Sequence, residues 1–92
     1  MSTGRIEAYL HSDSITPNKG GAMIRVVSQT DFAARTDEFI AFCKSAARMA
    51  FAAQADVWED VATVFPDIEA ERIVLSGKLR ETITVDRILL II

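Results

Sequence analysis

The sequence predicts an α+β fold: a three-stranded antiparallel sheet with helices packed on one face, in the order β-β-α-α-α-β. Three observations predict it. Two strand-like segments near the start, residues 5–10 and 22–28, flank a loop that holds Pro, Asn and a Gly pair. Apolar residues then recur at helical spacing through residues 37–80. The last segment, residues 82–92, returns to β-branched and aliphatic residues.

The first two strands are predicted to form a hairpin. In residues 5–10, Ile6, Ala8 and Leu10 alternate with Arg5, Glu7 and Tyr9, which is typical of a half-buried strand. The connecting segment, residues 11–21, is long enough for a hairpin loop and short for a crossover between parallel strands. We therefore expect residues 22–28 to return antiparallel.

Local signals divide the middle of the chain into three helices. Thr36 can cap a helix over residues 37–53, and the acidic residues that follow it suit the helix dipole. Asp56 has the capping-box spacing for a short helix that ends near Phe65. Pro66 suits the first turn of a third helix, which runs to about Arg80.

The closing strand raises the question of what covers the sheet. Residues 88–92 do not alternate, which predicts that both of their faces are covered. Helices on one side leave the other side of the sheet open, and Tyr9, Met23 and the apolar tail can supply exposed surface there. We therefore expect a homodimer formed through the open sheet face.

Length and composition favour one small domain, residues 1–92. The net charge of −3 gives no basic field, so direct binding of nucleic acid is not expected. No apolar segment is long enough to span a membrane, and no signal peptide is apparent. A single cysteine fits a reducing compartment, so a cytoplasmic protein is expected.

Catalytic and metal-binding residues are scarce. His11 is expected to be a solvated loop residue, and Cys43 lies on the apolar face of a predicted helix, where a core role is favoured over a nucleophile. One Cys and one His cannot form an ordinary zinc site, so no metal or cofactor is expected. Trp58 suits a lid on a small core better than an interface anchor. No two catalytic partners can be assembled, so we do not expect an enzyme.

The segment QTDFAAR, residues 29–35, carries the main functional question. Thr30 and Asp31 are good helix-start residues, but a helix start does not need an aromatic at its tip. Phe32 therefore has two explanations. It is either a buried staple on Phe39 or Phe42, or an exposed aromatic that contacts a partner.

The surrounding sequence resembles a known family. The segment IRVVSQTDFAARTDEF, residues 24–39, resembles the signature of translation elongation factor Ts. Residues 4–6 and Asn18-Lys19-Gly20-Gly21 match the family's preceding hairpin, residues 71–75 (ERIVL) its last helix, and residues 80–85 its closing strand. The resemblance covers residues 4 to about 89 in the family's order. Arg80 stands where the family has glycine, and residues 14–17 lengthen the hairpin loop.

The resemblance implies a function. The family binds the GTPase domain of elongation factor Tu and releases GDP, without covalent chemistry. It implies a partner-binding site that includes Thr30, Asp31 and Phe32. In this implied site, Phe32 wedges between helices of that domain, Asp31 bonds a partner group beside it, and Thr30 caps the tip. Arg35 follows the motif as a further contact.

Full-length family members begin with a small ubiquitin-associated-like domain, whereas this chain is expected to be a single core module without it. The alternative is therefore a module that binds elongation factor Tu without efficient exchange and recruits or diverts it. A dimer whose tip has no partner is a third reading.

Overall fold

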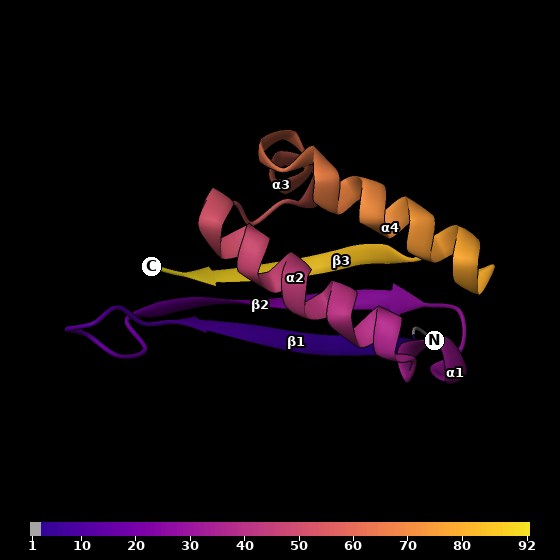
Figure 1. Ribbon diagram of the computed structural model, residues 1–92, viewed down its shortest axis with the longest axis horizontal. Helices are drawn as coiled ribbons and strands as arrows, with labels where there is room; N and C mark the ends of the chain where they lie inside the picture. Colours follow the sequence, from indigo (N-terminus) through magenta and orange to yellow (C-terminus); the bar gives the residue numbers. More distant parts are fainter. Residues whose placement is uncertain (1–2) are drawn as a thin grey trace.

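The computed structural model describes residues 3–92 and confirms the predicted α+β fold. All helices lie on one side of an antiparallel sheet with the strand order β1-β2-β3 (Figure 1). The elements are β1 (Thr3–His11), β2 (Gly20–Ser28), α1 (Asp31–Ala34), α2 (Asp37–Ala53), α3 (Trp58–Val64), α4 (Pro66–Leu79) and β3 (Thr84–Ile91). The structure adds α1, a one-turn helix, to the three helices that the sequence predicted.

The hairpin between β1 and β2 has a shorter loop than expected, residues 12–19, because His11, Gly20 and Gly21 belong to the strand ladder. Asp13 orders this loop. Its carboxylate accepts the backbone N–H groups of Ile15 at 2.9 Å and Thr16 at 2.5 Å, and it pairs with Lys19 at 2.9 Å. The Thr16 hydrogen bond, followed by the Lys19 contact, lowers the pKa of Asp13 to about 2.

The expectation that Tyr9 lies on the open face of the sheet is wrong. Tyr9 lies on the helix-covered side, where its ring centroid is 5.7 Å from that of Phe51, and not on the open side. Arg5 and Glu7 share that side and form an ion pair at 3.0 Å. Ile6 and Leu10 are on the open side instead. α2 packs over β1 and β2, and alanines make up much of its buried face.

The core lies between α2 and the centre of the sheet. Thr36 caps α2 as predicted, since its hydroxyl accepts the Phe39 N–H at 3.3 Å. The fully buried side chains with the largest volumes come from both layers: Phe39, Ile24, Ile83, Val26, Val61 and Cys43. This burial confirms that Cys43 is a core residue.

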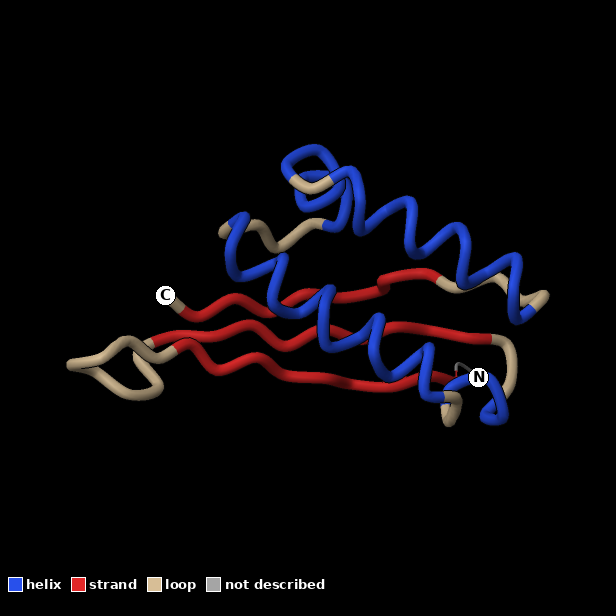
Figure 2. The backbone as a smooth tube through the Cα atoms, viewed as in Figure 1, coloured by secondary structure: helices blue, strands red, loops and turns tan. Residues whose placement is uncertain are grey.

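The start of α3 differs from the prediction. Its N-cap is Val57, which offers no side-chain oxygen, so Asp56 does not act as the cap. Pro66 does lie in the first turn of α4, as expected. Residues 54–65, which include α3, connect α2 to α4, and α3 is visible at the top of Figure 2.

One polar cluster joins α3, α4 and the residue that precedes β3. Glu69 accepts hydrogen bonds from the Trp58 indole at 3.0 Å and from Arg72, whose other nitrogen donates to the Ile83 carbonyl at 2.7 Å. The Trp58 ring meets the edge of Phe42 at a centroid distance of 6.1 Å. This placement confirms Trp58 as a lid on the core.

The open face of the sheet is apolar at the hairpin end. The ladder places Ala8, Met23 and Leu89 in one row, and Leu10, Gly21 and Ile91 in the next. Leu10, Met23, Leu89 and Ile91 are all exposed. The expectation that the tail is covered on both faces is therefore wrong for a single chain, because helices cover only one side.

Candidate functional site

The turn between β2 and α2 presents Phe32 to solvent. Phe32 is 80% exposed, whereas Phe39 and Phe42 are buried below it. The hydrophobic-staple explanation of Phe32 is therefore wrong. Burial therefore does not account for this aromatic, and its ring is accessible from outside the chain.

The helix that carries Phe32 is a single turn held from both ends. At its start, the Thr30 hydroxyl accepts the Ala33 N–H at 3.2 Å, so Thr30 is the cap that the sequence predicted. At its end, the Thr36 hydroxyl donates to the Ala33 carbonyl at 2.9 Å. Ala33 and Ala34 are buried and anchor the turn to the sheet.

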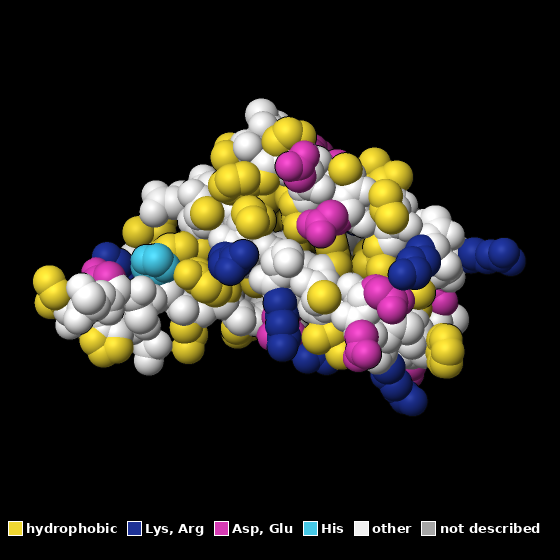
Figure 3. Space-filling view, viewed as in Figure 1, with side chains coloured by type: hydrophobic (Ala, Val, Ile, Leu, Met, Phe, Trp, Pro, Cys, Tyr) yellow, Lys and Arg dark blue, Asp and Glu magenta, His cyan; other side chains and the backbone are white. Residues whose placement is uncertain are grey.

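Asp31 and Arg35 flank Phe32 on the exposed surface. Asp31 is the first residue of α1 and Arg35 is its C-cap. Both side chains are exposed, so the structure brings Asp31, Phe32 and Arg35 to one end of the molecule. Figure 3 shows charged side chains of both signs at the end of the molecule that carries α1.

Residues 29–35, which contain α1 and its two caps, are called the tip below. The turn between α4 and β3 is hydrogen-bonded to the start of this tip. The Glu81 carboxylate accepts the N–H groups of Gln29 at 2.9 Å and Thr30 at 3.1 Å, and the Thr30 hydroxyl at 2.5 Å. The Gln29 side-chain oxygen in turn accepts the Thr82 N–H at 2.9 Å. The Thr30 hydroxyl bond, together with the two backbone bonds, lowers the pKa of Glu81 below its usual range.

Sequence reasoning missed Glu81 and Gln29 as parts of the site. They lie 52 residues apart, and neither sits in a local pattern that signals a bond to the other. The sequence therefore offers no signal for this pairing. In the structure, Arg80 adopts a left-handed conformation with φ 58°. That conformation ends α4 and turns Glu81 toward the tip. Glycine is the residue that usually occupies such a position.

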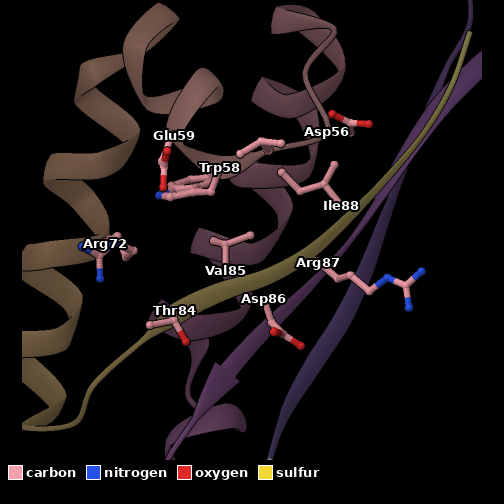
Figure 4. A pocket seen from close by; sticks show the side chains of 10 residues that line it. Asp56, Trp58, Glu59, Arg72, Thr84, Val85, Asp86, Arg87 and Ile88 are labelled. Atoms are coloured by element: carbon pink, nitrogen blue, oxygen red, sulfur yellow. The ribbon is translucent and has the colours of Figure 1, made fainter.

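The cavity between α3 and β3 borders the polar cluster around Arg72, whose groups are already hydrogen-bonded to one another. Its volume is about 430 Å³, and in it the Trp58 ring lies over Val85 and Arg87 points away (Figure 4). Arg72 at its edge is already bonded to Glu69 and the Ile83 carbonyl. This ion pair lowers the pKa of Glu69 and raises that of Arg72. The cluster is best explained as a structural tie.

His11 and Cys43, the two residues considered for catalysis, both pack against other side chains of the fold. His11 was expected to be a loop residue, but it is the last residue of β1. Its ring stacks on that of Phe51 at a centroid distance of 4.8 Å, and its Nδ1 is hydrogen-bonded to the Tyr9 hydroxyl at 2.9 Å. Burial raises the pKa of the Cys43 thiol to about 12. Within residues 3–92, no group of three or more His, Cys, Asp or Glu side chains is arranged to hold a metal ion. No helix in that range is long and apolar enough to cross a membrane.

Comparison with known proteins provides the relationship. The chain is 41% identical over 70 residues to elongation factor Ts of Pseudomonas savastanoi pv. phaseolicola and of Pseudomonas syringae pv. syringae. It is 39% identical over 70 residues to elongation factor Ts of Pseudomonas fluorescens. The chain is homologous to a segment of elongation factor Ts. Each match covers 76% of this chain but 23% of the relative, so the chain spans about a quarter of the length of these elongation factor Ts proteins. No protein-family model matches the chain.

Proposed function

We propose that this protein is an elongation factor Ts-like core module that binds elongation factor Tu in the cytoplasm and promotes GDP release. The homology to elongation factor Ts supports the class of partner. The 80% exposure of Phe32 on a turn held from both ends is the observation that supports the tip as the contact.

The proposed mechanism uses no covalent chemistry. Phe32 inserts between helices of the GTPase domain, Asp31 bonds a partner group beside it, and Arg35 adds a peripheral contact. A GTPase holds its nucleotide largely through Mg²⁺ and the N-terminus of a helix. A protein that prefers the distorted, nucleotide-free GTPase must weaken nucleotide binding by the same coupling free energy.

The test is release of a fluorescent GDP from elongation factor Tu. Wild type should accelerate release, and Phe32→Ala should lose most of that acceleration while staying folded. Ile15→Ala is the matched control, because Ile15 is also an exposed apolar residue but lies in the hairpin loop at the opposite end of the molecule (Figure 1). Equal acceleration by wild type and Phe32→Ala would refute the role of the tip.

A second candidate function is binding of elongation factor Tu without efficient exchange. The exposed tip supports this function equally, because its exposure supports a contact and not a particular effect of that contact on the nucleotide. In that case a pull-down would retain elongation factor Tu through Phe32, while GDP release would stay at its intrinsic rate.

We also propose that two copies pair through the open face of the sheet. The exposed apolar rows around Met23 and Leu89 support this, because contiguous apolar surface of this kind favours association. Sedimentation at micromolar concentration should show a dimer that Leu89→Glu dissociates. Val74→Glu, an exposed apolar position on α4, is the control and should leave the dimer intact. A monomeric wild type would refute the proposal.

A further inference from the structure

We propose that Glu81 is a positioning residue that fixes the conformation in which the tip presents Phe32. The proposal rests on the function proposed above for its effect on exchange, but its effect on the tip's shape is independent of any partner. It assigns to the turn between α4 and β3 a role in a site formed by residues far away in the sequence.

The argument begins with the hydrogen bonds of one carboxylate. One oxygen of Glu81 accepts the consecutive N–H groups of Gln29 and Thr30, at 2.9 and 3.1 Å. The other oxygen accepts the Thr30 hydroxyl at 2.5 Å. Hydrogen bonds to an ionised acceptor are stronger than those between neutral groups. Together they fix both the backbone and the side chain at the entrance to α1.

Glu81 also determines how Thr30 can act as a cap. A hydroxyl has one hydrogen to donate and lone pairs to accept with. Because the hydrogen is given to Glu81, a lone pair of the same oxygen is directed at the Ala33 N–H, 3.2 Å away. The carboxylate therefore orients the cap, and the cap closes the single turn that carries Phe32.

The position of Glu81 is itself fixed by the end of α4. Arg80 adopts the left-handed conformation, and the Glu81 N–H donates to the Ser76 carbonyl at 3.1 Å. The Ser76 hydroxyl oxygen accepts the Ile83 N–H at 3.1 Å on the other side of the turn. The Thr82 N–H also donates to the Gln29 side-chain oxygen. The hydrogen bonds that join Gln29 and Thr30 to Glu81 and Thr82 are called the clasp below.

Phe32 depends on this clasp because its own side chain contributes little to holding it. At 80% exposure, its direction is set by the backbone of residues 29–31 and not by packing. A contact group that is already in its binding conformation loses less conformational freedom on binding. We therefore expect the loss of Glu81 to weaken the action of Phe32 without removing Phe32.

The first experiment uses the free protein. Backbone ¹⁵N order parameters of residues 30–33 are measured in wild type, Glu81→Gln, Glu81→Ala and the control Glu71→Gln, which makes the same chemical change at an exposed position of α4. Wild type and the control should give values near ~0.85, and the Glu81 variants should fall toward ~0.6 at the tip only. Glu81→Gln is informative because its amide nitrogen cannot accept the Thr30 hydroxyl. Unchanged order parameters in both Glu81 variants would overturn the proposal.

The second experiment is a double-mutant cycle on GDP release from elongation factor Tu. Glu81→Gln should lower kcat/KM about tenfold in the wild-type background and have no further effect in the Phe32→Ala background. The same loss in both backgrounds would show that Glu81 does not act through Phe32, and would overturn the proposal. If wild type neither binds nor accelerates release, the proposed function fails, and the order parameters alone decide whether Glu81 positions the tip.

Discussion

Replacement of Phe32 by alanine should leave the stability of the fold almost unchanged, in contrast to the same change at Phe39. Full burial of a phenylalanine side chain contributes about 1.5–3 kcal/mol. With 80% of Phe32 exposed, only about a fifth of that contribution, roughly 0.3–0.6 kcal/mol, can be lost. Alanine is also the better helix former by a few tenths of a kcal/mol, which offsets part of the loss.

Phe39 provides the matched comparison because it is fully buried at 0% exposure. Phe39→Ala should cost about 3–5 kcal/mol, and Phe39→Leu, which removes less volume from the core, should cost less than Phe39→Ala. For a domain of this size, 1 kcal/mol corresponds to a shift in Tm of about 4–8 °C.

The assay is urea unfolding followed by the fluorescence of Trp58, the only tryptophan, whose ring packs on Phe42 in the core. The unfolding midpoint should be nearly unchanged in Phe32→Ala and strongly lowered in Phe39→Ala. A loss of about 2 kcal/mol or more in Phe32→Ala would refute the exposed placement of this ring. It would also remove the main support for the tip as a contact surface.

Four further predictions concern stability and reactivity. Arg80→Gly should raise the free energy of unfolding by about 0.5–1 kcal/mol in urea titrations, since Arg80 holds φ 58°; a loss would contradict the strain. Gly77→Ala should stabilise α4 by a similar ~0.5–1 kcal/mol, because a Cβ there meets no atom within 4 Å; an unchanged midpoint would argue against it. The pKa of Glu69 is lowered in the folded protein, so wild type should be more stable than Glu69→Gln above the ordinary glutamate pKa of roughly 4.3. This difference in stability should fade as the pH falls through the lower pKa of the folded protein. A difference that does not depend on pH would exclude this linkage. Cys43, fully buried with a pKa of about 12, should react with a thiol reagent at pH 8 only when the protein opens, so fast labelling of the native protein would disprove its burial.

Local signals in the sequence predicted the elements well. Thr36 caps α2 and Pro66 opens α4, because both act through atoms of neighbouring residues. The capping box at Asp56 failed since the helix begins two residues later, after Val57. The facing of β1 was also missed. Its two rows of side chains both contain large apolar groups, so alternation alone does not say whether Tyr9 or Leu10 points to the helices.

The candidate site was predictable in part. Thr30 as a cap follows from its side chain and its position, and the structure bears it out. The exposure of Phe32 did not follow from local physics, because a staple on Phe39 explained the same residues equally well. Glu81 could not be predicted at all, since its bonds to the tip form only when the chain folds back over 52 residues.

The clasp makes the shape of the tip depend on parts of the chain that are far apart in the sequence. The β1–β2 hairpin closes a short loop and can form early, since closing a short loop costs little chain entropy. The Glu81 side of the clasp lies beyond α2, α3 and α4 in the sequence, so its bonds to the tip need the chain to fold back over 52 residues. A nascent or partly unfolded chain therefore already contains the Thr-Asp-Phe sequence but not its shape. The shape in which Phe32 is presented therefore depends on contacts between the two halves of the chain, and not on the local sequence alone.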